Sequence, residues 1–299
     1  MDVLIKILPV YLLFLAGIVL KLLKIIKKEN AEFLLKLVFY FTLPALIIRS
    51  LSSVPLDFKV SLMPLISALI ILITYFFSLI YVKINKLPAE KAGVLFAGTM
   101  ILNIGFIIPF VHSVYGDYGL SRLLLFDFSN GFLAYSVVYA IAVRHGNKDN
   151  NLKSVWKKLL FSPPLWALMI ALFLNIFHLQ IPVNIVPFLE ISGNLTIPLL
   201  LIAIGVFFEP QLTQFRNLAA AVFIRMILGL LLGFIFVKIF QLEGINKLIV
   251  LAGASAPAGF NTLTFATLEN LDKKFAAVFV SVSILIAMIW IPILILLMK

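Results

Sequence analysis

Ionisable side chains inside long apolar stretches are the residues of this sequence best suited to chemistry. Asp127 lies in the stretch LLLFDFSNGFLAY, and Asn130 follows three residues later, which places both side chains on one face of a helix. Burial in an apolar environment favours the protonated form of a carboxylate, so Asp127 could take up a proton on one side of a membrane and release it on the other. The alternative is a carboxylate that pairs with Arg122, near the end of the same segment.

Glu190 and Arg225 are the other charged candidates for coupling or support. Glu190 and Asn194 form an i, i+4 pair in FLEISGNLTIPLLL, and Arg225 lies about two turns into its apolar segment. Ionisable residues within a membrane are candidates for function because they are costly there. Structural ion pairing explains both residues equally well, so both interpretations stay open.

Helix-breaking residues mark two stretches near the middle of their segments, KAGVLFAGTMILNIGFIIPFV and KLIVLAGASAPAGFNTLTFA. Unwound backbone survives at membrane depth only inside protein or beside water. The second half of each interrupted helix would then start near the midplane with free N–H groups, which suit an anion such as a carboxylate. Two ordinary packing kinks are the alternative. The candidate substrate-binding residues are Asn103, Ile104, Gly105, Pro257, Gly259 and Asn261.

Composition and segment length indicate the elements that position these residues. The chain is 63% hydrophobic and 12% charged, with a mean hydropathy of +1.15, whereas soluble domains carry roughly 25% charge. Stretches of about 20 apolar residues are long enough to cross a bilayer. We predict an all-α polytopic membrane protein that forms a single membrane domain. Its ten expected segments are 3–22, 31–52, 61–82, 90–113, 119–143, 159–177, 184–208, 217–240, 245–268 and 275–298.

An internal repeat relates the two halves of the chain. A shift of 154 residues places Pro9 on Pro163, Pro44 on Pro198 and Gly105 on Gly259. Five segments per half reverse the direction in which the second half enters the membrane, and such inverted repeats with broken helices are typical of secondary transporters. The predicted division is a first repeat at 1–143, a cytoplasmic loop at 144–158 and a second repeat at 159–299.

The net charge of +11 follows membrane topology rather than nucleic-acid binding. Lysine and arginine gather in the loops after segments 1, 3, 5, 7 and 9, whereas the other side holds little more than Lys59, Arg122 and Lys247. The positive-inside rule then places both termini outside a cell membrane. The three histidines lack metal-ligand spacing and are expected at the surface, and there is no cysteine.

Four motifs, in order, resemble the auxin efflux carrier family, which includes plant auxin exporters and bacterial permeases of malonate, malate and other organic acids. They are TLPALI in segment 2, NIGFIIP in segment 4, TIPLLLIAIG in segment 7 and APAGFNTLTFA in segment 9. The resemblance covers essentially the whole chain. It implies a fold similar to bile-acid/sodium symporters and sodium/proton antiporters, and it suggests a homodimer.

The resemblance also implies roles for segments and residues. Segments 1, 2, 6 and 7 would form a scaffold, segments 3–5 and 8–10 a moving transport domain, and the broken helices 4 and 9 would cross at the substrate site. Asn103 corresponds to the crossover asparagine and Pro257 to the crossover proline. The plant carriers have a proline where this chain has Leu102, so unwinding of segment 4 would rely on Gly105 and Pro109.

We therefore expect a secondary active transporter of small organic anions, mono- or dicarboxylates that are auxin-like or malonate/malate-like. It would work by alternating access, for which an elevator movement of the transport domain is the first expectation. H+ or Na+ is the candidate coupling ion. A membrane-embedded ligand sensor on a carrier fold is the alternative. An enzyme is not expected, since the sequence offers no paired catalytic set, metal-ligand cluster or phosphate loop, and no cofactor is expected.

Overall fold

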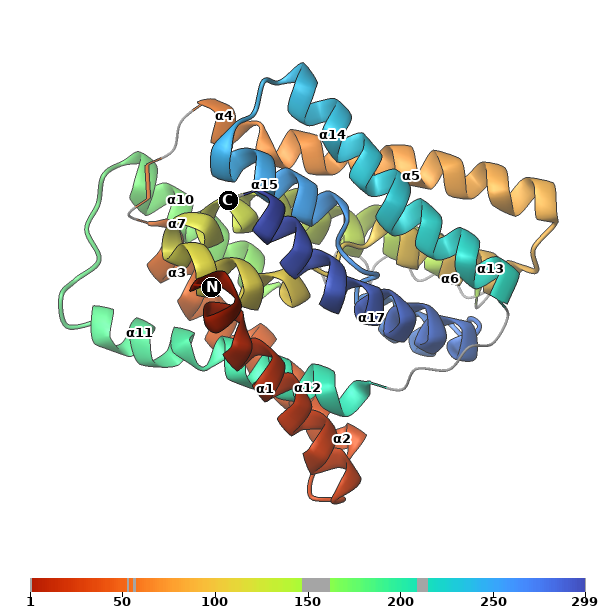
Figure 1. Ribbon diagram of the computed structural model, residues 1–299, viewed down its shortest axis with the longest axis horizontal. Coiled ribbons are helices and arrows are strands. Elements are labelled where there is room, and N and C mark those ends of the chain that lie inside the picture. Colours follow the sequence, from red (N-terminus) through yellow and green to blue (C-terminus); the bar gives the residue numbers. More distant parts are fainter. Residues whose placement is uncertain (1, 53, 56–57, 147–161, 209–214, 299) are drawn as a thin grey trace. The chain divides into compact units, whose positions relative to one another are not determined.

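The computed structural model describes residues 2–52, 54–55, 58–146, 162–208 and 215–298 (Figure 1). These residues are almost entirely helical, and the only β-type pairing among them is an antiparallel bridge between Leu102 and Ala258. Seven helical runs within the described part are long and apolar enough to cross a membrane, and two shorter apolar helices accompany them. The chain is therefore an all-α, multi-pass membrane protein.

Two compact units divide the chain. Unit 1 consists of Met1–Asp57, Ile108–Leu124 and Ser162–Phe208, and unit 2 consists of Phe58–Ile107, Leu125–Phe161 and Glu209–Lys299. Unit 1 thus holds segments 1, 2, 6 and 7, and unit 2 holds most of segments 3–5 and 8–10. Helix α7 (Ile104–Leu133) contributes to both units, because its middle part belongs to unit 1.

Three helices of unit 1 have a proline at their start. Pro44, Pro163 and Pro187 lie within the first two positions of their helices, where the missing N–H has no intrahelical partner to lose. Besides residues of α7, the elements are α1 (Asp2–Leu22), α2 (Lys28–Leu37), the π-helical turn η1 (Val38–Thr42), α3 (Leu43–Leu51), α10 (Pro163–Ile176), α11 (Val186–Asn194) and α12 (Thr196–Phe207).

Glycines allow the backbones of unit 1 to approach each other closely. A Cβ atom on Gly17 of α1 would lie 2.3 Å from the carbonyl oxygen of Ile202 in α12, and one on Gly205 would lie 2.2 Å from the carbonyl oxygen of Phe14. Figure 1 shows α12 beside α1. Small residues at such crossings are the usual means by which membrane helices pack. Any larger side chain at Gly17 or Gly205 would separate the two helices.

Unit 2 holds the two interrupted helices. Asp272 caps the last helix, since its Oδ1 accepts a hydrogen bond from the backbone N–H of Phe275 at 2.8 Å. Besides residues of α7, the elements are α4 (Phe58–Ser61), α5 (Met63–Asn85), α6 (Ala89–Met100), the π-helical turn η2 (Ala134–Val138), α8 (Tyr139–His145), α13 (Phe215–Val222), the π-helical turn η3 (Phe223–Leu228), α14 (Gly229–Ile239), α15 (Gly244–Ala254), α16 (Asn261–Leu268) and α17 (Lys273–Leu297).

Segment 4 is interrupted at a different place, and for a different reason, than the sequence predicted. Helix α6 ends at Met100 and α7 begins at Ile104, so the extended residues precede Gly105. Pro109 lies inside α7 rather than at the break. The expectation that Gly105 and Pro109 unwind this segment is therefore wrong. Hydrogen bonds from other elements to the extended residues hold the break instead.

The remaining segments lie close to the predicted ones, with two additional irregularities. Segment 7 is interrupted at Leu195, between α11 and α12. Segments 4 and 5 meet at Gly116, whose non-helical backbone (φ +58°, ψ −152°) forms a kink inside α7. This conformation favours glycine. Most of the predicted loop at 144–158 lies outside the described residues, and the inverted orientation of the second half stays a prediction.

Candidate functional site

The interruptions of segments 4 and 9 pair with each other inside unit 2. The backbone N–H of Asn103 donates to the carbonyl oxygen of Pro257 at 2.9 Å, and the N–H of Gly259 donates to the carbonyl oxygen of Ile101 at 3.0 Å. A Cβ atom on Gly259 would lie 2.4 Å from Cγ2 of Ile101, so this position requires glycine. Backbone groups in an apolar interior must find partners. We call the paired stretches 101–103 and 255–260 the crossover.

Asn130 of α7 completes the hydrogen bonding of Leu102. Its Oδ1 accepts from the backbone N–H of Leu102 at 2.9 Å, and its Nδ2 donates to the carbonyl oxygen of Leu102 at 3.0 Å. The backbone N–H and the carbonyl oxygen of Leu102 are therefore both hydrogen-bonded to one side-chain amide. This clamp explains why the chain is extended here although no proline precedes Asn103.

Asp127 is connected to the crossover through Asn130. The Nδ2 of Asn130 donates to Oδ1 of Asp127 at 2.7 Å, so the two side chains share a face as their spacing predicts. Arg122, the alternative partner of Asp127, donates to the carbonyl oxygen of Tyr118 at 2.9 Å, and its guanidinium carbon lies 3.5 Å from the centre of the Tyr118 ring. The carboxylate is thus one hydrogen-bonded residue away from the unwound backbone.

Asn103 uses both ends of its side chain within the crossover. Its Oδ1 accepts from the backbone N–H of Phe106 at 3.1 Å and caps α7, and its Nδ2 donates to the carbonyl oxygen of Ala258 at 3.3 Å. The N–H of Ala258 donates to Oγ of Ser283 at 3.1 Å. Of the two roles that the sequence allowed, a free amide for substrate or a strap on the unwound chain, the contacts favour the strap.

Arg225 is fully buried and binds the carbonyl ends of both interrupted helices. Nη1 donates to the carbonyl oxygen of Thr99 in α6 at 2.7 Å, and Nη2 donates to the carbonyl oxygen of Ala254 in α15 at 2.6 Å. One turn later, a Cβ atom on Gly229 would lie 2.2 Å from the Ala254 oxygen, so glycine allows this close approach. The carbonyl ends carry partial negative charge, which the guanidinium offsets.

Beyond the crossover, two tyrosines of unit 2 extend the polar contacts. Nδ2 of Asn261, at the first position of α16, donates to the hydroxyl of Tyr135 at 3.2 Å. One turn further, the hydroxyl of Tyr139 donates to Oε1 of the buried Glu269 at 2.5 Å. Sequence reasoning missed Tyr135, Tyr139 and Glu269. The i, i+4 tyrosine pair was the available signal.

The candidates at the helix starts differ in exposure. Ile104 is buried and Gly105 is partly exposed at the first two positions of α7, and Pro257 contributes the carbonyl that Asn103 binds. The N–H groups of Thr262 and Leu263 donate to the carbonyl oxygens of Gly259 and Phe260, so the start of α16 contributes mainly its positive partial charge. The crossover therefore has two chemically different sides. One side presents helix starts, and on the other the helix ends are occupied by Arg225.

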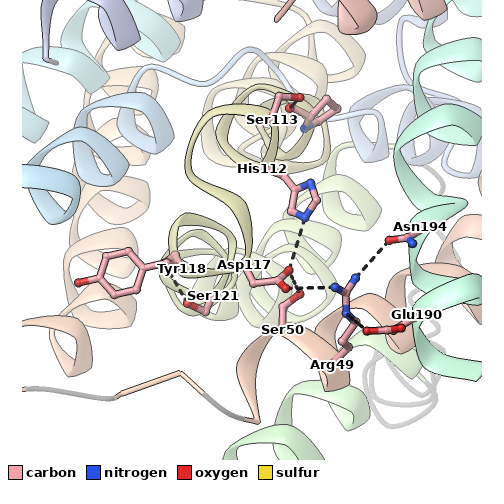
Figure 2. A network of polar contacts seen from close by, with 10 residues as sticks. Arg49, Ser50, His112, Ser113, Asp117, Tyr118, Ser121, Glu190 and Asn194 are labelled. Atoms are coloured by element: carbon pink, nitrogen blue, oxygen red, sulfur yellow. Dashed lines mark hydrogen bonds and ion pairs between the residues drawn. The ribbon is translucent and has the colours of Figure 1, made fainter. Parts of the chain in front are cut away.

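Glu190 belongs to a different polar cluster, in unit 1 (Figure 2). We call it the Arg49 cluster; it comprises Arg49 and Ser50 of α3, His112 and Asp117 of α7, and Glu190 and Asn194 of α11. Nη2 of Arg49 lies 3.4 Å from Oδ2 of Asp117, its Nε lies 3.7 Å from Oε1 of Glu190, and its Nη1 donates to Oδ1 of Asn194 at 3.2 Å. The structural pairing of Glu190 that the sequence left open is thus present.

Asp117 is the second centre of the Arg49 cluster. Oγ of Ser50 donates to Oδ1 of Asp117 at 2.9 Å, and Nε2 of His112 lies 3.4 Å from the same oxygen. His112 was expected at the surface, but it lies partly buried beside a carboxylate. Among the described residues, no group of three or more His, Cys, Asp or Glu side chains could hold a metal ion.

Comparison with known proteins gives a consistent result over nearly the whole chain. A family described as Membrane transport protein matches residues 2–295. The chain is 27% identical over 310 residues to an uncharacterized transporter of Methanocaldococcus jannaschii, covering 97% of each chain. It is 22% identical over 292 residues to an uncharacterized transporter of Methanothermobacter thermautotrophicus, covering 96% of this chain and 95% of the other.

Proposed function

The chain belongs to the membrane transport protein family, which contains the auxin efflux carriers, and we propose that it is a secondary carrier of small organic anions. As a member of a transporter family it is a multi-pass membrane transporter and not an enzyme. The observation that carries the proposal is the polarity of the crossover. The positive ends of α7 and α16 begin at Ile104 and Asn261, while Arg225 neutralises the opposite helix ends.

The substrate class follows from this polarity. A carboxylate carries two oxygens that accept hydrogen bonds from N–H groups at helix starts, and the nearby positive partial charge favours it over a cation. The hydroxyl of Tyr135, beside Asn261, adds a neutral polar group that suits a second oxygen of the substrate. Mono- or dicarboxylates, auxin-like or malonate/malate-like, are therefore the proposed substrates.

Alternating access by an elevator movement is the proposed mechanism. The division into two units supports it, because unit 1 holds the segments that the family resemblance assigns to a scaffold and unit 2 holds the crossover. Residues Ile108–Leu124 depart from that assignment, since they belong to unit 1. The moving part would then carry the crossover, and α7 would bend where it leaves unit 2, beside Pro109.

Proton coupling through Asp127, both termini outside a cell membrane, and a homodimer complete the proposal. The hydrogen bond from Asn130 to Asp127 supports coupling, because it links a titratable group to the unwound backbone. The uneven distribution of lysine and arginine among the loops supports the orientation. The lipid bilayer is the expected surrounding, and nucleic acid is not an expected partner.

Flux across reconstituted membranes tests the function directly. The protein would be placed in liposomes, and uptake of labelled organic acids measured with and without unlabelled acid inside. We expect saturable uptake of at least one carboxylate, accelerated by internal substrate. Asn130→Ala, which releases Leu102, should lower that uptake, whereas Arg122→Lys, on the unit 1 part of α7, should leave it close to wild type. Saturable binding without any exchange would favour the ligand sensor instead.

A further inference from the structure

The two helix ends that point into the crossover are the kind of position at which broken-helix transporters bind a coupling cation. Unwound carbonyl groups and the C-terminal ends of half-helices coordinate Na+ in such proteins, because both carry partial negative charge. Here the corresponding carbonyl oxygens are those of Thr99, near the end of α6, and Ala254, the last residue of α15. Both accept a hydrogen bond from Arg225.

The contacts of Arg225 are those of a built-in cation rather than of an ion-pair partner. Its donor–acceptor distances of 2.7 and 2.6 Å are in the range of charge-assisted hydrogen bonds. Both acceptors are neutral carbonyl groups, and no carboxylate among the described residues forms an ion pair with it. Its Nε is buried without a hydrogen-bond partner in the described structure. Within the described residues, the positive charge is therefore offset by the two helix ends.

Local structure fixes the guanidinium at this position. Arg225 lies in the π-helical turn η3, and a fully buried side chain has no path to water along which it could withdraw. Gly229 leaves the space in which Nη2 and the Ala254 carbonyl meet, since a Cβ atom there would lie 3.0 Å from Nη2. The cation is thus a permanent part of unit 2.

We propose that the Arg225 guanidinium is the resident cation of the crossover, occupying the carbonyl ends that a coupling Na+ would need. Binding at the crossover is then independent of Na+, which leaves H+ as the coupling ion of the two candidates. The inference rests on the proposed carrier function, because it identifies which ion that function uses. A fixed charge also keeps the helix-start side selective for anions throughout the cycle.

The first test compares cations on the wild-type protein, without any knowledge of the substrate. Thermal unfolding in detergent is measured in NaCl and in choline chloride at equal ionic strength. A ligand that binds only the folded state raises the melting temperature with its concentration. We expect no saturable difference between the two salts. A saturable Na+-dependent rise for the wild type would overturn the proposal.

The second test removes the resident cation. Arg225→Ala leaves the two carbonyl oxygens and the space of the guanidinium, so the melting temperature should fall. It should be restored in part by guanidinium at low millimolar concentration, and a saturable response to NaCl should emerge. Arg225→Lys keeps a positive charge and should stay insensitive to NaCl. Arg122→Ala, the matched control, removes a buried arginine of unit 1 and should gain no response to NaCl.

The outcomes separate this inference from the proposed substrate class. If Arg225→Ala folds but responds to neither cation, Arg225 is a packing residue and the proposal is wrong. If the alanine variant is not produced in folded form, Arg225→Lys and Arg225→Gln replace it in the test. An equal fall of the melting temperature in both variants would contradict a role of the charge. If the cation responses appear but no carboxylate is transported, Arg225 keeps its role and the substrate class is wrong.

Discussion

Arg225 of unit 2 and Arg49 of unit 1 are each the centre of a polar cluster, but they are held in opposite ways. Arg225 is 0% exposed and donates to two carbonyl oxygens, whereas the Arg49 side chain is 26% exposed and lies beside the carboxylates of Asp117 and Glu190. The carboxylates of Asp117 and Glu190 outnumber the single arginine of the Arg49 cluster. The Arg225 site keeps a net positive charge.

The comparison separates interactions that hold the backbone in place from ion pairs that can be lost at little cost in stability. Carbonyl groups that lose a buried donor cannot turn to water, so each contact of Arg225 should stabilise unit 2. Partly exposed ion pairs contribute little because water and salt compete with them. The crossover should therefore behave as a fixed element, and the Arg49 cluster as an adjustable one.

The largest difference is expected between the two arginines themselves. Arg225→Met leaves two buried carbonyl groups without donors, at about 1–3 kcal/mol each, so the free energy of unfolding should fall by roughly 2–6 kcal/mol. Arg49→Met should lower it by at most about 1 kcal/mol. Reversible unfolding in mixed micelles measures both values. Equal losses would contradict the distinction between fixed and adjustable clusters.

The next largest difference in stability is expected between the two stretches of the crossover, 101–103 and 255–260. Asn130→Ala deprives Leu102 of a donor and an acceptor, whereas Ser283→Ala removes only the acceptor for the N–H of Ala258. Asn130→Ala also removes the hydrogen bond to Asp127, so at about 1–3 kcal/mol per unsatisfied group the asparagine variant should lose at least about twice as much stability. Amide hydrogen exchange at Leu102 and Ala258 shows which strand has loosened. Faster exchange at Ala258 in Asn130→Ala than in Ser283→Ala would count against this assignment.

The next comparison is between the transport flux of two asparagine variants, one in the crossover and one in the Arg49 cluster. Asn103→Ala removes a helix cap and the strap to Ala258, so we expect at least a roughly tenfold fall in flux for a stability cost of about 1–2 kcal/mol. Asn194→Ala removes one contact of Arg49 and should leave flux within about twofold. Pro257→Ala should resemble Asn103→Ala. The flux of all three variants is measured in proteoliposomes after matching the amount of folded protein by size-exclusion chromatography.

The smallest effects on stability are expected from two carboxylates, and they should differ in kind. Asp127→Asn keeps the hydrogen-bonding shape but cannot titrate, so transport should proceed with its dependence on pH lost. Wild-type transport should change as falling pH protonates Asp127. Asp117→Asn should keep the pH profile and lower stability by about 0.5 kcal/mol, less so in high salt. A pH profile unchanged in Asp127→Asn removes this residue from the coupling.

Helix positions could be predicted because they depend on local sequence, whereas the break of segment 4 precedes Gly105 and those at Gly116 and Leu195 were not predicted. Apolar length fixed the segments to within a few residues, and the spacing of Asp127 and Asn130 gave their shared face. The cause of the break in segment 4 was missed because Asn130 reaches Leu102 across 28 residues of chain. The partners of Arg225 lie 126 and 29 residues away. Contacts between residues so far apart in the sequence depend on tertiary packing, which local spacing does not predict.

The Arg49 cluster was missed for a related reason. Arg49 lies near the end of its segment, where a cation ordinarily extends toward water, and Asp117 lies in the turn beside Gly116. Nothing in either local pattern points to the other residue. Only Glu190 and Asn194 were identified, because they lie within one helix at i, i+4.

The close packing of Gly17 against the helix that contains Gly205 has a consequence for biogenesis. Helix α1 is synthesised first, but the surface that its glycine requires is made much later. At ~5–20 residues per second, Gly205 leaves the ribosome roughly 10–40 s after Gly17. During that interval the first helix must reside in the bilayer without its partner. Unit 1 is therefore completed late, from helices already inserted, and a chain released before α12 leaves the Gly17 face of α1 uncovered.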